Sequence, residues 1–193
     1  MGAAEAPPDQ DVADLLRGDV RAFERTFHAI QPALLRYLGS LVADEAQDVA
    51  GETWLQVTRD LRTFRGDGAD FRRWVVQIGR NRALDHLRAR GRRPFDAVDP
   101  RELPEVGTDD STFGQASESM ATERALALIR RLPRDQAEAL LLRVVVGLDA
   151  PAAARVLRKR PGAVRMATSR GLQRLREIVE AEQGVTLPDS LTL

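Results

Sequence analysis

Residues 150–180, APAAARVLRKRPGAVRMATSRGLQRLREIVE, carry the most specific structural pattern in the chain. Apolar spacing predicts a short helix over 150–157 and a longer one from Pro161 to about Glu180, with the tight turn RKR between them. A short helix, a turn and a longer basic helix form the outline of a helix-turn-helix, although helical hairpins without a role in DNA binding produce the same outline.

The charge of this segment favours DNA. Residues 151–176 contain seven Arg and Lys159 but no Asp or Glu. A basic helix face can be ordinary solvated surface, but a run of this length without an acid indicates a polyanionic partner. The residues that we expect to contact duplex DNA are Arg158, Lys159, Arg160, Arg165, Met166, Ser169 and Arg170.

Helical periodicity also runs through the first half of the chain. Asp19 can cap a helix that Pro32 should kink or interrupt, and helices follow over about 44–61 and 70–92. A Gly/Asp-rich loop at 62–69 separates the last two helices. The order of these elements predicts a small helical domain.

The second half of the chain predicts a further helical domain. A helix over about 120–131 precedes a helix that Pro133 opens and Gly147 ends, and the helix-turn-helix follows. No segment alternates apolar and polar residues for long enough to indicate a strand. We therefore expect an all-α protein.

Composition divides the chain into domains and connectors. Between 94 and 119 there are three Pro, two Gly, seven Asp or Glu and a single Arg, without a helical stripe, which is typical of a flexible acidic linker. Two basic blocks on either side of an acidic segment indicate that a polyanion is held at two places. The predicted organisation is a disordered tail (1–10), a first domain (11–93), the linker (94–119), a second domain (120–182) and a C-terminal tail (183–193).

The segment from Phe64 to Arg93 interleaves aromatic rings with arginines. Aromatic faces can stack on unpaired bases while guanidinium groups hold phosphates, as in proteins that bind single strands. Phe71 is expected in the core by its periodicity, Trp74 could be core or accessible, and Phe64, in the loop, is expected to be the most accessible ring. The candidate residues for single-stranded DNA are Phe64, Arg65, Arg73, Trp74, Arg80 and Asn81.

Several classes of function find no support in the sequence. The chain has no cysteine and two histidines, His28 and His86, without ligand-like spacing, so we expect neither a metal site nor a cofactor. No phosphate-binding loop, nucleophile elbow or His–carboxylate cluster is visible, which indicates a binding protein and not an enzyme. No apolar run is long enough for a membrane span and no signal peptide is visible, so a cytoplasmic protein is expected.

Taken in order, these segments resemble the extracytoplasmic-function sigma factors, the minimal group of the sigma-70 family. The resemblance is carried by GDVRAFERTFHAIQPALLRYL, DEAQDVAGETWLQVTRDLRTFRG and FRRWVVQIGRNRALDHLRARGRR in the first half. In the second half it is carried by ALALIRRLPRDQAEALLLRVVVGLDAPAAARVLRKRPGAVR and the basic helix that follows. The sequence departs from the family pattern at Gly51, where Gln is usual, and at Met166 to Thr168 of the last helix.

The resemblance implies a role for each part of a non-catalytic promoter-specificity subunit of RNA polymerase. The helix at 44–61 would dock on the clamp helices of the largest polymerase subunit through Asp48, Glu52 and Gln56, and the second domain would meet the β flap. The first domain would recognise and open the −10 element, with Phe64 and Asn81 lining a pocket for a flipped base. The final helix would enter the major groove of the −35 element, and the linker would thread toward the active-site cleft. An anti-sigma factor is a further implied partner.

Two other classes of protein agree less well with the sequence. A stand-alone helix-turn-helix regulator explains residues 151–176 but gives no reason for the first domain or the acidic linker. A helical enzyme acting on nucleic acid would need metal-ligand clusters that the sequence lacks.

Overall fold

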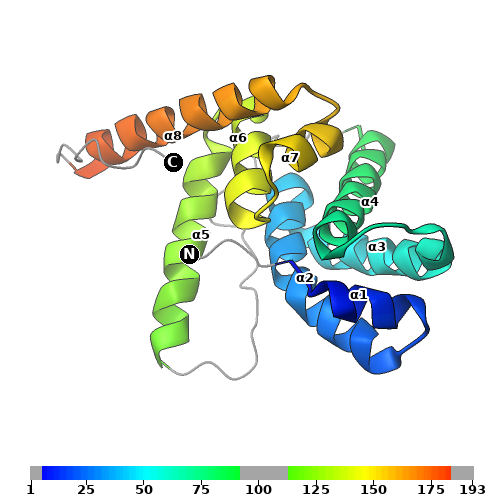
Figure 1. Ribbon diagram of the computed structural model, residues 1–193. Coiled ribbons are helices and arrows are strands. Elements are labelled where there is room, and N and C mark those ends of the chain that lie inside the picture. The colour runs from blue at the N-terminus through cyan, green and yellow to red at the C-terminus, as the bar shows by residue number, and fades with distance from the viewer. Residues whose placement is uncertain (1–5, 92–112, 184–193) are drawn as a thin grey trace.

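The computed structural model describes residues 6–91 and 113–183, and these residues contain helices and no strand. The first group of helices comprises α1 (Asp9–Leu16), α2 (Val20–Val42), α3 (Ala46–Asp60) and α4 (Gly68–Ala89), with short 3-10 turns η1 (Ala43–Glu45) and η2 (Leu61–Thr63). The second group comprises α5 (Phe113–Arg130), α6 (Arg134–Leu140), the π-helical turn η3 (Leu141–Val145), α7 (Ala150–Leu157) and α8 (Pro161–Gln183). The prediction of an all-α protein with two helical domains is confirmed (Figure 1).

Helix α2 is the central element of the first domain. Its N-terminus is capped by Asp19, whose carboxylate accepts hydrogen bonds from the backbone N–H groups of Arg21 and Ala22. The helix continues through Pro32 without a break, so the expected interruption is absent. Its buried residues recur at helical spacing and include Ile30, Leu34, Tyr37, Leu38 and Leu41.

Helices α3 and α4 pack against each other and against α2. The α3 side of this core contains Val49, Thr53 and Val57, and the α4 side contains Phe71 and Val75, all with exposed fractions of 1% or less. Phe71 is therefore a core residue, as its periodicity predicted.

Residues 1–5 of the expected disordered tail (1–10) lie outside the described residues, and helix α1 contradicts that expectation for the last two residues of the tail. It begins at Asp9, and Pro7 before it is buried. The Asp9 carboxylate accepts a hydrogen bond of 2.9 Å from the backbone N–H of Gly68, the first residue of α4. Asp67 caps the same helix through the N–H of Asp70, so two carboxylates stabilise the N-terminus of α4.

The second domain is built around α6 and η3. Leu140, Leu141 and Leu142 are almost completely buried, and α8 packs against both α6 and α7. Gly147 ends the segment with a positive φ of 76°, as predicted for a helix C-terminus. Helix α5 begins at Phe113, inside the segment 94–119 predicted as linker, and most of that segment lies outside the described residues.

We expect any side chain at Gly68 to destabilise the protein, because the backbone at Pro7 lies directly against this glycine. A Cβ at this position would lie 1.9 Å from the backbone oxygen of Pro7, closer than any non-bonded contact allows. Gly68→Ala should therefore displace the segment before α1 and lower the free energy of unfolding in urea by about 1–3 kcal/mol.

The matched control for Gly68 is Gly51 in the exposed part of α3, where an added Cβ meets nothing within 4 Å. Gly51→Ala should raise the free energy of unfolding by about 1 kcal/mol, because alanine is the better helix former. If both substitutions were neutral or stabilising, the packing described for Pro7 against α4 would be incorrect.

Candidate nucleic-acid interface

The last two helices form the predicted helix-turn-helix. Helix α7 ends at Leu157, Arg158 adopts the left-handed conformation with φ 55° and turns the chain, and α8 starts at Pro161. The first turns of α8 are anchored by Val164, which is fully buried. Four side chains of the first three turns of α8 are exposed: Arg165, Met166, Ser169 and Arg170.

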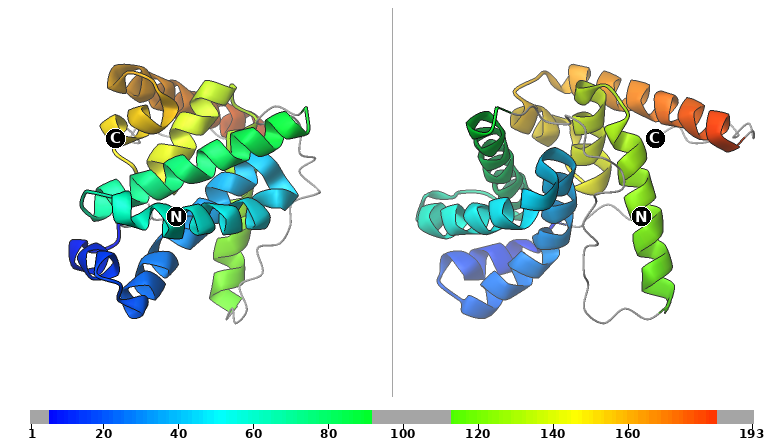
Figure 2. Two further views of the ribbon diagram at one scale, coloured as in Figure 1. Left: turned by 90° about the vertical axis from the view of Figure 1, so that its right-hand side faces the viewer. Right: turned by 180° about the vertical axis from the view of Figure 1, so that it is seen from behind.

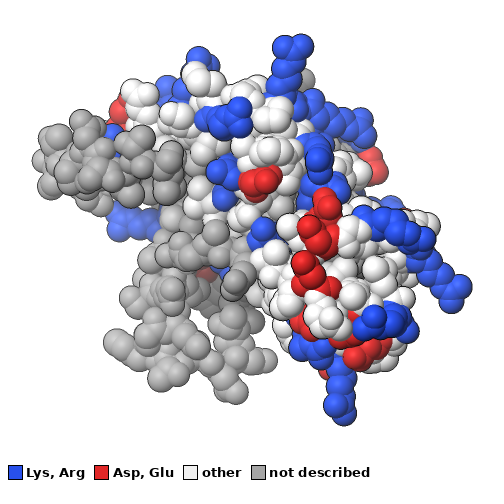
Figure 3. Space-filling view, in the orientation of Figure 1, with Lys and Arg blue, Asp and Glu red and all other residues white. Residues whose placement is uncertain are grey.

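The turn between the two helices extends this surface. Arg158, Lys159 and Arg160 are exposed, and Lys159 forms an ion pair of 2.6 Å with Asp135 of α6. All seven residues predicted to contact duplex DNA therefore lie at the turn or on the outer face of α8. In Figure 3, Lys and Arg side chains gather on the corresponding edge of the molecule, where α7 and the start of α8 lie in Figure 1. This arrangement can present arginines to a major groove.

The aromatic residues near the N-terminus of α4 form one cluster. The Phe64 ring lies 5.1 Å from the rings of both Phe71 and Trp74, and the Phe71 and Trp74 rings are 5.7 Å apart. Phe64 is only 5% exposed, so the expectation that it is the most accessible ring is wrong. Trp74 is half-buried. The physical reason is that η2 turns the chain back so that the Phe64 ring covers Phe71.

Other predicted single-strand residues lie on the outer part of α4 and its preceding loop. Asn81 is exposed and lies two helical turns beyond Trp74, which places both on the same side of the helix. Arg73 is paired with Asp70 at 3.3 Å. Arg65 is exposed, and its guanidinium donates hydrogen bonds to the carbonyls of Arg62 and Phe64.

Arg80 differs from its neighbours because it faces the second domain. Its Nε donates a hydrogen bond of 2.6 Å to the Glu138 carboxylate of α6, and its side chain is 13% exposed. The structure therefore does not bring Arg80 together with Asn81 on the open surface. The sequence contained no signal for this pair, because the two residues belong to different predicted domains.

Helix α3 presents a mixed face to solvent. Asp48 and Glu52 are exposed, as predicted, whereas Gln56 is half-buried and accepts a hydrogen bond from Arg82 of α4. Leu55 lies on the same face and is 58% exposed, an unusual position for a leucine that the sequence analysis missed. Its sequence signal was available, since Leu55 falls outside the buried stripe of this helix.

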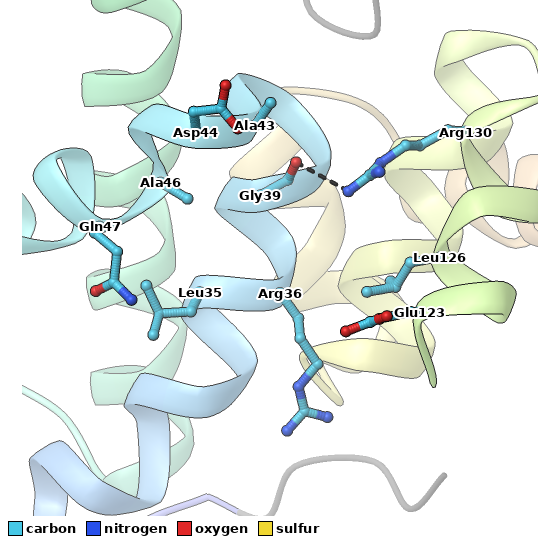
Figure 4. A pocket seen from close by; sticks show the side chains of 10 residues that line it. All are labelled: Leu35, Arg36, Gly39, Ala43, Asp44, Ala46, Gln47, Glu123, Leu126 and Arg130. Atoms are coloured by element: carbon cyan, nitrogen blue, oxygen red, sulfur yellow. Dashed lines mark hydrogen bonds between the residues drawn. The ribbon is translucent and has the colours of Figure 1, made fainter. Parts of the chain in front are cut away.

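A small hollow of about 120 Å³ lies where the two domains meet. Leu35 of α2 and Leu126 of α5 contribute to its apolar lining, and Arg130 of α5 crosses it to donate a hydrogen bond of 3.0 Å to the backbone oxygen of Gly39 (Figure 4). The remaining lining residues are Arg36, Ala43, Asp44, Ala46, Gln47 and Glu123.

The part of the chain that the structure describes lacks two kinds of feature. Within 6–91 and 113–183 there is no group of three His, Asp or Glu side chains placed to hold a metal ion. In the same residues, none of the helices combines the length and apolarity required to cross a bilayer.

Comparison with known families matches both domains. Residues 26–93 match sigma-70 region 2, and residues 122–175 match sigma-70 region 4. The ECF RNA polymerase sigma factor SigD of Mycobacterium tuberculosis is 35% identical over 181 residues, which cover 90% of this chain and 84% of SigD. The ECF RNA polymerase sigma factor ShbA of Streptomyces griseus is 34% identical, with 86% of this chain and 91% of ShbA covered.

Solved structures share the fold. CnrH in complex with the cytosolic domain of CnrY has a TM-score of 0.62 and 21% identity, covering 92% of this chain and 99% of CnrH. The sigma factor RpoE of Bartonella quintana, in complex with the anti-sigma factor NepR, has a TM-score of 0.63 and 22% identity, covering 85% of this chain and all of RpoE. With both family regions matched in order over most of its length, the chain belongs to the extracytoplasmic-function sigma factors of the sigma-70 family.

Proposed function

We propose that this protein is a transcription initiation factor that binds core RNA polymerase in the cytoplasm and directs it to a specific set of promoters. The observation that carries this function is the pairing of a region 2 domain with a region 4 domain whose α8 exposes Arg165 and Arg170. The factor itself is non-catalytic and needs no cofactor, since polymerase supplies the chemistry.

The proposed division of labour follows the two domains. The first domain, which includes α1, binds polymerase and acts on the −10 element, and the second domain, from α5 onward, binds the −35 element and contacts the β flap. The acidic segment between the two domains occupies the path that RNA later takes. An anti-sigma factor is proposed as a regulator, since RpoE of B. quintana is solved with one.

The experiment that tests the function as a whole is run-off transcription. Core polymerase and the purified chain should together give discrete transcripts from a genomic library, and neither should do so alone. A stand-alone regulator would instead shift promoter DNA without polymerase.

We expect Asp48 and Glu52 to hold core polymerase. Both carboxylates are exposed on the face of α3 that also exposes Leu55, which supports a docking surface of mixed charged and apolar character. Changing both residues to Lys should weaken binding to core polymerase about tenfold or more, because like charges would then meet across the contact. The measurement is the dissociation constant for core enzyme by biolayer interferometry.

The control for this charge reversal is Glu24→Lys, which changes an exposed acid on α2. It should leave the affinity for core polymerase unchanged. Equal affinity for the control and for the Asp48/Glu52 double variant would show that α3 is not the docking helix.

Arg165 and Arg170 are expected to differ in their effect on DNA sequence preference. Arg165 lies in the first turns of α8, where recognition helices contact base edges, and Arg170 lies farther along the helix, where it can hold phosphate. A good bidentate contact to a base discriminates by about 1–3 kcal/mol. In transcription from a panel of −35 variants, Arg165→Ala should flatten the preference among them, and Arg170→Ala should weaken all of them evenly. A uniform loss with Arg165→Ala would exclude base readout by this residue.

Asn81 is expected to act in strand opening. Its amide is exposed and offers a donor and an acceptor to a base edge, on the same side of α4 as Trp74. Extruding a base costs a few kcal/mol, about what stacking at roughly 1–3 kcal/mol per base and one or two hydrogen bonds return. Asn81→Ala should therefore reduce the open complex, measured by permanganate reactivity of thymines, while closed-complex formation is retained.

A template with a pre-melted −10 region should restore most transcription by Asn81→Ala, because the cost of unpairing has been removed. The control is Asp85→Ala, an exposed change one turn farther along α4. An equal defect on paired and pre-melted templates would place Asn81 outside the opening step. Phe64→Ala tests the same step less cleanly. The Phe64 ring is buried, so its removal would also reduce the packing of the domain.

A further inference from the structure

One arginine beside the hollow between the domains has an unused hydrogen-bond donor. The last turns of α5 lie beside the end of α2 (Figure 2), in agreement with the contacts between these helices. Arg130 of α5 donates from one terminal nitrogen to the backbone oxygen of Gly39. Its Nε is buried and meets no acceptor within residues 6–91 and 113–183. A buried N–H without an acceptor is unfavourable, so a ligand that supplied one would be stabilised there.

Arg80 of α4 shows what Arg130 lacks. Both side chains are half-buried and cross from one domain to the other. Burial lowers the pKa of the Arg80 guanidinium, but the hydrogen bond and the negative charge of Glu138 raise it above its usual value. Burial also lowers the pKa of the Arg130 guanidinium, and no carboxylate of the described residues offsets this. Arg130 is therefore a partly desolvated cation without a counterion, and an incoming anion would relieve that cost.

The hollow next to Arg130 has apolar walls. Leu126 lies one helical turn before Arg130 on the same face of α5, and Figure 4 shows both side chains coming from this helix. Leu35 of α2, Ala43 and Ala46 of α3 complete the apolar lining. Leu126 and Ala46 are buried. A guanidinium beside an apolar hollow suits a ligand that combines a carboxylate with a short carbon chain.

The acidic residues of the lining do not neutralise the Arg130 end of the hollow. Asp44 is exposed, so solvent screens its charge. Glu123 precedes Arg130 by seven residues of α5, which is roughly 10 Å at about 1.5 Å per residue.

A second arginine adds positive charge to the same lining. Arg36 of α2 is half-buried, and its Nε donates to the carbonyl of Pro32. Burial lowers the pKa of the Arg36 guanidinium, again without a carboxylate that offsets the effect among the described residues. The field of the hollow therefore favours an anion over a neutral or cationic ligand.

The volume of the hollow limits the length of the carbon chain. An engineered apolar cavity of about 150 Å³ holds benzene, a molecule of six carbons. The hollow has about 120 Å³, so it accommodates a chain of roughly four or five carbons. A longer chain would extend from the hollow into solvent.

We propose that the hollow between α2 and α5 is a binding site for a short aliphatic carboxylate. The carboxylate accepts a hydrogen bond from the Nε of Arg130, and the carbon chain lies against Leu35 and Leu126. This site goes beyond the function proposed above, because its ligand is a small molecule and not polymerase or DNA. Arg130 and Leu126 belong to neither of the surfaces assigned to those partners.

Binding can be measured on the full chain with pentanoate as the probe. In proton–nitrogen correlation spectra, added pentanoate should shift amide resonances in a saturable way, most strongly for residues at the hollow such as Gly39 and Leu126. Each buried methylene raises affinity about three- to fourfold, so acetate, which is three methylenes shorter, should bind about 30–50-fold more weakly. Pentan-1-ol and pentylammonium should bind at least about fivefold more weakly than pentanoate, because neither supplies a charged acceptor.

A matched pair of substitutions tests the role of Arg130. Arg130→Met removes the guanidinium, keeps an unbranched side chain, and should weaken pentanoate binding about tenfold or more. The control is Arg131→Met at the next position, where the side chain is exposed and paired with Glu182. It should leave the affinity for pentanoate unchanged. Equal affinity in the two variants would overturn the assignment of the carboxylate to Arg130.

Filling the hollow provides a second test that keeps Arg130 in place. Ala46→Leu adds a larger side chain to the lining and should abolish the saturable shifts. Circular dichroism reports whether each variant retains its helices, and unchanged pentanoate affinity in a folded Ala46→Leu would overturn the location of the site. The ligand series on the unsubstituted chain decides the matter even if a variant unfolds. Shifts that do not saturate with pentanoate, or that saturate equally with pentan-1-ol, would overturn the proposal.

Discussion

The buried ion pair between Glu138 and Arg80 joins the two domains of the chain. A carboxylate that is 4% exposed has to keep its donors, and here those donors belong to the other domain. The arrangement of the two domains is therefore tied to the charge state and identity of very few side chains. A buried pair of this kind adds little net stability, because desolvation offsets most of the Coulomb attraction, whereas removing one partner leaves a buried charge without its donors. The loss of either side chain should therefore cost more than the pair itself contributes.

Local patterns in the sequence were good predictors of local structure. The turn RKR, with Pro161 opening the next helix, placed α7 and α8 almost residue by residue, and Asp19 and Gly147 marked helix ends correctly. These signals depend on backbone groups within a few positions of the residue itself. The exposure of Arg165 and Arg170 followed from the same helical period that buried Val164.

Contacts between distant segments were not predictable in this way. Phe64 was expected to project from its loop. Its ring instead packs against the ring of Phe71, which follows it on α4. Helix α1 was missed because it has only eight residues, too few for the apolar spacing of Val12 and Leu15 to identify a helix, and its position depends on Asp9 meeting Gly68. The partner of Arg80 lies 58 residues along the chain, and nothing in either segment alone identifies it. Each miss involves a side chain whose environment is supplied by another element.

The structure also shows which basic side chains of each domain already have partners within the chain. The sequence indicated a nucleic-acid contact for residues 71–93, which contain eight Arg and one Asp. In the folded chain, some of those arginines already have anionic or carbonyl partners, such as Glu138 for Arg80 and Gly147 for Arg72. The arginines of α8 at positions 165 and 170 instead remain exposed. A count of basic residues therefore overstates the nucleic-acid surface available on the first domain and represents that of the second more faithfully.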